Sequence, residues 1–339
     1  MSGLVVAWRV HVMTRAPLGE RLAAAALILS GVLAVGTAGA QQQNLGNKIL
    51  GTAGLDAGKQ ADPGLYLVNR YLSYAAYASI DRNGNRLPNR LALGVVSDAL
   101  GITGTLELKP LATYVGVTVS VPFSRVSRQD GDVQTSIDTF GLADMYFQPL
   151  RLGWRLPQVD LVAGFAVYIP TGHFEPGGVG NLGSGQWSSE LSLGSTVYLD
   201  PDKAWWLSAL SSYQSNLYKQ DVDIRRGATL QIQGGAGVGI EDFLALGPVG
   251  YALWQVSDDT GTDLPVVLER ARDRAFGLGA EVDFLLAPLR SKLVMRYAHD
   301  LSARSRPLGQ IFAFALAFSA WKPSAVPRLA DLWWQDATE

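Results

Sequence analysis

Apolar and polar residues alternate one by one along most of this chain. The pattern is clearest at 275–286, where every second position is apolar: Phe276, Leu278, Ala280, Val282, Phe284 and Leu286. The positions between them are small or acidic and include Glu281 and Asp283. Successive side chains of a β-strand point to opposite faces, so this segment predicts a strand with one apolar and one polar face. A soluble sandwich would cover the apolar face with a second sheet, whereas a membrane barrel turns it to lipid and keeps the polar face for the lumen.

The alternation predicts twelve strands. Their approximate ranges are 64–80, 89–101, 112–127, 135–150, 157–170, 186–200, 203–217, 227–241, 246–257, 272–287, 290–303 and 308–321. Connections after the odd-numbered strands are long and polar, as at 81–88, 127–134, 170–185, 218–226 and 257–271. Those after the even-numbered strands are mostly short. An even strand count with long loops at one end is typical of outer-membrane barrels. We therefore expect an all-β fold, a transmembrane antiparallel β-barrel of about 12 strands over residues 64–321.

The first forty residues are typical of a signal peptide. Arg15 and Arg21 precede a short apolar run at 22–35, and Ala38-Gly39-Ala40 fits a cleavage site. The run is shorter than the ~20 residues of a spanning helix. Either Met1 or Met13 can be the start. We expect export through a cleaved signal peptide (1–40) and assembly into the outer membrane of a Gram-negative bacterium. The implied partners are outer-membrane lipid and the barrel-assembly machinery.

Two segments flank the predicted barrel. Residues 41–63 are polar and lack strand alternation, so they form either a solvated periplasmic lead or a plug inside the barrel. Four apolar residues give a plug something to bury, and we expect 44–58 to enter the periplasmic mouth: Leu45, Ile49, Leu50 and Leu55. Residues 322–339 form a C-terminal tail after the last aromatic strand residues.

Composition excludes several classes of function. The chain has no cysteine, which rules out disulfides and thiolate chemistry, and its net charge of −2 offers no basic excess for nucleic acid. After residue 40 the only histidines are His173 and His299. Ser302 lies three residues after His299, so a strand would point the two side chains to opposite faces. We expect no enzyme and no cofactor. An outer-membrane lipid hydrolase is the weakest alternative.

Four charged residues are predicted to meet in the lumen. Glu281 and Asp283 lie on the polar face of one strand, and Lys292 and Arg296 lie on the polar face of the next. Two interpretations remain open. The four form cross-strand charge pairs that hold the wall, or they form a charged constriction that filters solutes.

Tyrosine and tryptophan cluster near the predicted strand ends. Such residues are typical of the aromatic girdles of a membrane barrel. The candidates are Tyr71, Tyr74, Tyr77, Trp154, Trp205, Trp206, Trp254 and Trp321.

A set of ordered motifs adds a family resemblance. The motifs are Pro63-Gly64-Leu65-Tyr66; Gly141-Leu142-Ala143-Asp144 with Gln148-Pro149; Tyr168-Ile169-Pro170-Thr171-Gly172; Gly178-Val179-Gly180-Asn181-Leu182-Gly183 with Trp187; and Tyr251 with Gln255, Asp258 and Asp259. With them, residues 63–318 resemble the outer-membrane transporter family named for the meta-cleavage pathway of phenol degradation. The resemblance implies an outer-membrane barrel that passes small, hydrophobic or aromatic compounds, and it assigns no catalytic residue.

The expected function is passive uptake of small solutes through the lumen. The lumen and selectivity candidates are Tyr168, Glu190, Gln255, Asp258, Asp259, Glu281, Asp283, Lys292 and Arg296. The main alternative is a structural or receptor barrel that does not conduct. The sequence leaves open whether the lumen is open or plugged.

Overall fold

The computed structural model describes residues 45, 47, 49–88, 91–130, 133–178, 180–265 and 270–323. The predicted signal peptide (1–40) lies outside these residues, and so does the predicted tail beyond residue 323. No helix in the described part of the chain is long and apolar enough to cross a membrane.

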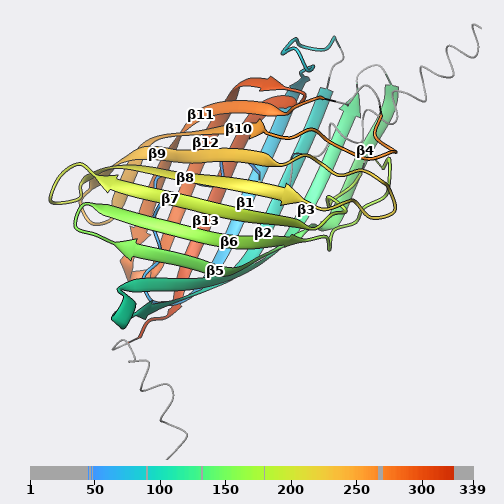
Figure 1. Ribbon diagram of the computed structural model, residues 1–339. Helices are drawn as coiled ribbons and strands as arrows, with labels where there is room; N and C mark the ends of the chain where they lie inside the picture. The colour runs from blue at the N-terminus through green and yellow to red at the C-terminus, as the bar shows by residue number, and fades with distance from the viewer. Residues whose placement is uncertain are drawn as a thin grey trace, which may run out of the picture.

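In the described residues, thirteen strands form one antiparallel sheet (Figure 1). They are β1 (Gly64–Ser79), β2 (Leu91–Leu108), β3 (Thr113–Asp130), β4 (Val133–Leu142), β5 (Met145–Arg155), β6 (Val159–Ile169), β7 (Ser188–Tyr198), β8 (Trp205–Asn216), β9 (Thr229–Ile240), β10 (Leu244–Gln255), β11 (Arg274–Leu286), β12 (Ser291–Arg304) and β13 (Pro307–Trp321). The short 3-10 helices η1 (Lys109–Leu111) and η3 (Ala287–Leu289) lie in turns between strands.

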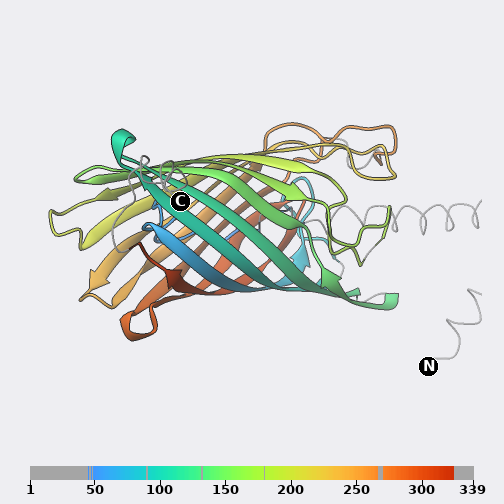
Figure 2. The same ribbon diagram turned by 90° about the horizontal axis from the view of Figure 1, so that it is seen from below.

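The sheet closes on itself. β1 pairs with both β2 and β13, β2 pairs with β3, β3 pairs with both β4 and β5, and the strands from β5 to β13 pair in sequence order. Figures 1 and 2 show the resulting tilted barrel from two sides. Within the described residues, closure gives every strand except β4 a partner on both edges, so most backbone polar groups of the wall pair with one another in lipid. The prediction of an all-β, twelve-stranded antiparallel barrel is therefore confirmed.

Thirteen strands make a twelve-stranded barrel because one predicted strand is broken into two, β4 and β5, which share one place in the wall. The sequence predicted a single strand at 135–150, whereas β4 and β5 lie end to end along β3. β4 pairs with the second half of β3 (123–130), and β5 pairs with the first half (114–120). Pro122 of β3 faces the break and has no N–H for the ladder. Its carbonyl oxygen accepts a hydrogen bond from Ala143 N (2.9 Å) instead.

The loops sort by end of the barrel nearly as predicted. The connections after β1, β6, β8 and β10 are long and share one end, called here the long-loop end. Those after β2, β5, β7, β9 and β11 are short and define the short-turn end. Two connections at the long-loop end differ from the prediction. The expected loop at 127–134 is largely strand, since β3 extends to Asp130 and β4 starts at Val133, and only Ser305 and Arg306 join β12 to β13.

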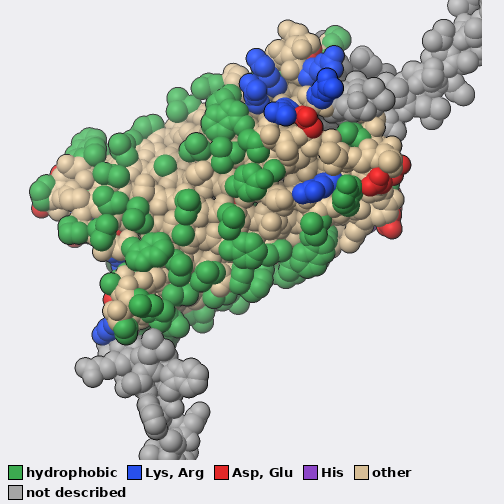
Figure 3. All heavy atoms as spheres, viewed as in Figure 1, with side chains coloured by type: hydrophobic (Ala, Val, Ile, Leu, Met, Phe, Trp, Pro, Cys, Tyr) green, Lys and Arg blue, Asp and Glu red, His purple; other side chains and the backbone are tan. Residues whose placement is uncertain are grey.

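The two faces of each strand have the expected environments. On β13, Phe312 and Phe318 are exposed on the outer wall, while Ile311 is 2% exposed and points inward. On β11, Phe276 and Leu278 are exposed, and Glu281 is 2% exposed. Figure 3 shows apolar side chains spread over the outer wall of the barrel. An apolar exterior and a polar interior are the arrangement that lipid demands.

Two of the proposed girdle aromatics face the lumen instead, so that part of the prediction is wrong. Tyr74 is 4% exposed and donates a hydrogen bond to Asp300 Oδ2 (3.2 Å). Trp206 is 6% exposed, whereas its neighbour Trp205 is 56% exposed. Adjacent strand residues point to opposite faces, so Trp205 and Trp206 cannot both belong to the girdle.

Candidate functional site

The segment before β1 lies inside the barrel. Leu55 is fully buried, Leu50 is 3% exposed and Leu45 is 8% exposed. Leu45 and Leu50 pack in one cluster with inward side chains of the wall, including Tyr251 and Ile311. We call the described residues of 45–62 the plug. It rises from the short-turn end, where β1 begins, to the long-loop end, where Arg306 donates a hydrogen bond to Leu45 O (3.3 Å). The sequence expectation placed 44–58 only at the periplasmic mouth.

Glycines of the wall make room for the lower part of the plug. A Cβ on Gly116 would lie 2.5 Å from Gln60 Nε2, and a Cβ on Gly153 would lie 2.5 Å from Gln60 Cβ. Arg151 Nε donates to Gln60 Oε1 (2.8 Å), and Arg155 Nη2 donates to Gln60 O (2.9 Å). The absence of side chains at these two wall positions lets Gln60 lie against the strands, where two arginines hold it.

Trp206 binds the middle of the plug. Its indole Nε1 donates to Leu55 O (2.8 Å). Lys59 Nζ lies 4.0 Å from the centroid of the Trp206 ring, a cation–π distance. A buried Trp needs a partner for its N–H, and here the plug backbone supplies it.

The four predicted lumen charges do meet, and the plug joins them. Arg296 forms a buried ion pair with Glu281, and Lys292 Nζ lies 2.8 Å from Asp283 Oδ2. Glu281 Oε1 also accepts a hydrogen bond from Leu55 N (3.1 Å).

The cations of this group bind the plug as well. Arg296 Nη1 donates to Gly51 O (2.7 Å), and Lys292 forms an ion pair with Asp56. Charge-assisted hydrogen bonds of this kind are about twice as strong as neutral ones. The charged group therefore anchors the plug in addition to pairing across the strands.

Tyr168 and Glu190 lie on a different part of the wall. Tyr168 OH donates to Glu190 Oε2 (3.1 Å), and both side chains are buried. The Tyr168 ring lies 5.2 Å from the ring of Tyr146 on the neighbouring strand. The pair lies on β6 and β7, apart from the charged group on β11 and β12.

The remaining candidates lie at the long-loop end. Gln255 Nε2 donates to Asp259 Oδ1 (2.6 Å), which also accepts a hydrogen bond from Gly227 N (2.8 Å). Asp258 is exposed and pairs with Arg272 (2.7 Å). The hydrogen bond from Arg272 holds the pKa of Asp258 below its usual range. Gln255 and Asp259 thus tie loops together, and Asp258 lies at the rim.

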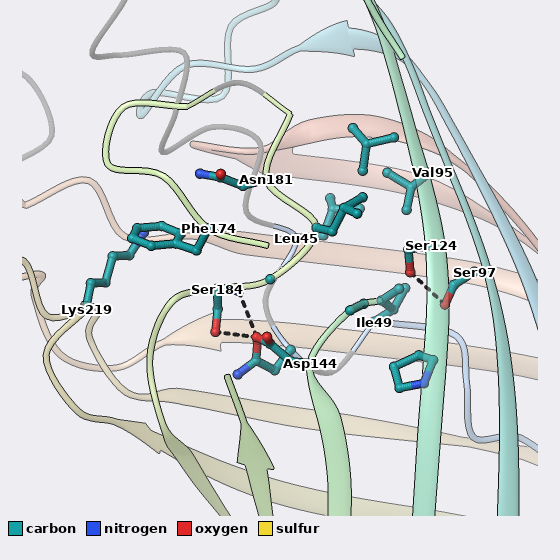
Figure 4. Close-up of a pocket in the computed structure, with 16 residues that line it drawn as sticks. Leu45, Ile49, Val95, Ser97, Ser124, Asp144, Phe174, Asn181, Ser184 and Lys219 are labelled. Carbon is teal, nitrogen blue, oxygen red and sulfur yellow. Dashed lines mark hydrogen bonds between the residues drawn. The ribbon is translucent and has the colours of Figure 1, made fainter. Parts of the chain in front are cut away.

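A cavity of about 160 Å³ lies between the upper plug and the long-loop end of the barrel (Figure 4). Its walls come from the plug, from β2 and β3, and from the loop after β6. The apolar lining residues are Leu45, Ile49, Val95, Pro122, Val126, Ala143, Phe174 and Leu182. The polar side chains include a hydrogen-bonded pair, Ser124 and Ser97 (3.0 Å), on the strand wall.

Asp144 sits in the strand break and holds the loop that closes the cavity. Its carboxylate accepts hydrogen bonds from Gly172 N (3.1 Å), Ser184 N (2.7 Å) and Ser184 Oγ (2.6 Å). Asp144 and Gly172 belong to separate motifs of the sequence and Ser184 directly follows a third, and the fold brings the three together. Asp144 is the last residue of the Gly141-Leu142-Ala143-Asp144 motif, from which no role for its carboxylate could be predicted.

Lys219 is the cation of the cavity, and sequence reasoning missed it. It comes from the loop after β8, and its Nζ lies 5.2 Å from the centroid of the Phe174 ring. Burial, with repulsion from Arg226, lowers the pKa of Lys219 to about 8. A lone lysine in a polar loop carries no sequence signal for this position.

These features define an outer-membrane β-barrel channel with an occupied lumen. The barrel is similar to the crystal structure of the COG4313 outer membrane channel from Pseudomonas putida F1, with a TM-score of 0.69 and 16% identity over 78% of this chain and 97% of that chain. The CymD monoaromatic hydrocarbon channel matches with a TM-score of 0.39 and 9% identity over 77% of this chain and 89% of that chain. A search of curated proteins found no match.

The chain belongs to the family described as "Putative MetA-pathway of phenol degradation", which matches residues 78–316. This confirms the resemblance drawn from the motifs. The COG4313 structure, to which the barrel is similar, is described as an outer membrane channel. Its place is the outer membrane.

Proposed function

We propose that this protein lets small hydrophobic or aromatic compounds cross the outer membrane passively, and that its plug restricts passage. The observation that carries the proposal is the cavity, lined by both apolar and polar side chains, at the long-loop end, which in barrels of this kind is extracellular. Its volume, about 160 Å³, is close to that of an engineered apolar cavity of ~150 Å³ that takes up benzene. A single aromatic ring therefore fits between the plug and the wall.

The plug favours compounds of this type over large polar solutes. Leu50 and Leu55 fill lumen space that a porin leaves to water, and burying each contributes about 1.5–3 kcal/mol. Glu281 and Arg296 use part of their hydrogen-bonding capacity to bind the backbone of the plug. We infer that these charges act on passage by holding the plug, and that solutes do not meet them as an open filter.

Cavity filling tests the proposal. Val126→Trp places a large ring in the cavity, whereas Val117→Trp is a matched control on the outer face of the same strand, where Val117 is 43% exposed. Uptake of radiolabelled phenol, benzoate and arabinose is measured in porin-deficient Gram-negative cells that express each variant. We expect Val126→Trp to lower aromatic uptake at least about tenfold and Val117→Trp to leave it unchanged.

Deleting residues 41–60 tests the role of the plug. We expect single-channel conductance in a planar bilayer to rise, and arabinose to enter, while heat-modifiable migration on a gel shows that the barrel still folds. Unchanged conductance would show that the plug does not restrict passage. No aromatic uptake by any variant would favour a structural or receptor barrel that does not conduct.

We also infer that residues 1–40 are removed on export. Cleavage after Ala40 would leave Gln41 as the first residue, four positions before Leu45 in the plug. N-terminal sequencing of the protein from outer membranes should begin at Gln41, and any other start would contradict this cleavage site.

A further inference from the structure

Two arginines of the outer wall face each other at the long-loop end. Arg274 and Arg304 are directly opposite in the register of β11 and β12, and both are exposed. Like charges in directly opposite positions of an antiparallel pair destabilise the sheet. An anionic group bound outside the barrel would therefore stabilise this pair of strands.

A third arginine extends this pair into a row. Arg86, in the loop after β1, donates from Nη2 to Tyr77 O (3.3 Å). Arg304 reaches the same loop, because its Nε lies 3.7 Å from where a Cβ on Gly84 would be. Figure 3 shows Lys and Arg side chains gathered at the end of the barrel that carries this loop. We call Arg86, Arg274 and Arg304 the arginine row.

In the part of the chain that the structure describes, no carboxylate pairs with the two opposed arginines of the row. Within the described part of the chain, the guanidinium groups of Arg274 and Arg304 form no ion pair and no hydrogen bond. Asp81, in the same loop as Arg86, has its carboxylate taken by Asn83 N and Asn85 N (both 2.8 Å). Each guanidinium carries five N–H donors, so most donors of the row are available to a ligand.

The row lies next to aromatic residues of the outer wall. Trp254 is paired with Arg274 in the register of β10 and β11, and its ring packs edge-on against Phe276 at 5.3 Å. The ring of Tyr77, whose carbonyl oxygen accepts the hydrogen bond from Arg86, stacks on His299 at 5.8 Å. Aromatic girdles mark the boundary between hydrocarbon and head groups. The guanidinium groups are therefore at the level of the head groups in the outer leaflet.

We propose that the arginine row binds the phosphate groups of a lipid in the outer leaflet. Arginine offers a planar fork that matches phosphate oxygens in two-point contacts. Basic clusters at head-group level attract anionic lipid. Three arginines from two strands and one loop hold one lipid head group, which removes the repulsion between Arg274 and Arg304 and ties the loop after β1 to the barrel wall.

The test compares lipid binding to the purified full-length protein. The probes are lipid A with its phosphates, the same lipid after removal of the phosphates, and inorganic phosphate. The variant is Arg274→Gln with Arg304→Gln. The control is Arg125→Gln, because Arg125 is also exposed on the outer face and is already paired with Asp138. Heat-modifiable migration confirms folding, and Arg304→Gln alone serves if the double variant does not fold.

We expect the double variant to bind phosphorylated lipid A at least about tenfold more weakly than the wild type, while Arg125→Gln binds like the wild type. Without lipid, the double variant should unfold at the same or a higher temperature, since a repulsive pair is gone. Equal affinity of wild type and double variant would overturn the proposal. So would equal binding of dephosphorylated lipid, or displacement of the lipid by an equal concentration of inorganic phosphate.

Discussion

Replacing Gly58 with valine should push the plug out of the barrel without altering the wall. Gly58 N donates to Ser208 Oγ (2.8 Å), so the plug backbone lies directly on the strands here. A Cβ on Gly58 would overlap the carbonyl group of Ser195 and lie 2.7 Å from Ser195 N. These are backbone atoms of β7, which a change of rotamer cannot move away. The plug must therefore shift by about 1 Å to reach ordinary van der Waals contact.

The cost of that shift can be worked out from these contacts. Overpacking of a tight site costs about 1–3 kcal/mol, and a buried donor that loses its partner costs about 1–3 kcal/mol. Together they favour the displaced plug by roughly 2–6 kcal/mol, which is at least about a thirtyfold change in the ratio of docked to displaced plug. Gly54→Val adds to the effect, since its Cβ would overlap the Glu281 carboxylate.

Single-channel recording in a planar bilayer measures the result. We expect higher mean conductance for Gly58→Val and a further increase when Gly54→Val is added. Ala61→Val is the matched control, because it adds the same bulk at an exposed plug position. If the double variant folds and conducts like the wild type, the plug does not control the lumen and the reasoning is refuted.

Two further predictions concern the lipid face and pH. Phe314→Arg should cost about 2–4 kcal/mol if it lies at mid-membrane and should reduce the yield of barrel assembled in outer membranes. Ala315→Arg is the control, because its side chain points into the lumen, and it should assemble well. Equal yields of the two variants would contradict the assignment of the lipid and lumen faces of β13. Burial raises the pKa of Asp56, but Lys292 and Lys59 outweigh it and lower the pKa to about 2. Because the pKa of Asp56 is lower when the plug is inside the barrel, the ionised carboxylate favours the inserted plug above about pH 4. This stabilisation is lost as the pH falls toward 2 and Asp56 takes up a proton. Conductance should therefore match at pH 7 and pH 5 and rise only in stronger acid; a rise between pH 7 and pH 5 would contradict the role of this ion pair.

The face of each strand residue could be predicted because the side-chain period of a strand is two. A slip by one residue would move every apolar side chain from lipid to the lumen. Lipid on one side and polar groups on the other therefore leave one register for each strand. Glu281 and Arg296 could be placed on one face by this rule, and the structure pairs them directly. The number of strands follows in the same way from the number of alternating segments.

The role of those charges could not be predicted, because it depends on a segment far away in the sequence. Lys292 meets Asp56 across 236 positions, and Arg306 meets Leu45 across 261 positions. Contacts between residues so far apart produce no periodic pattern in the amino-acid sequence. The plug sequence alone fitted a solvated lead as well as a buried segment, since its apolar residues follow no regular spacing.

The sequence by itself determined the barrel, its lipid face and its membrane class, because an apolar belt imposes a strict alternation on every strand. Only the tertiary structure decided which lumen-facing residues of the wall contact the plug. Trp206 resembles a girdle residue until the fold turns it onto Leu55, and Gly116 and Gly153 are ordinary strand glycines until Gln60 lies against them. The cavity likewise needs the plug, a strand break and two loops in one place. Alternation is a local property that lipid enforces residue by residue, whereas the contents of the lumen depend on long-range packing.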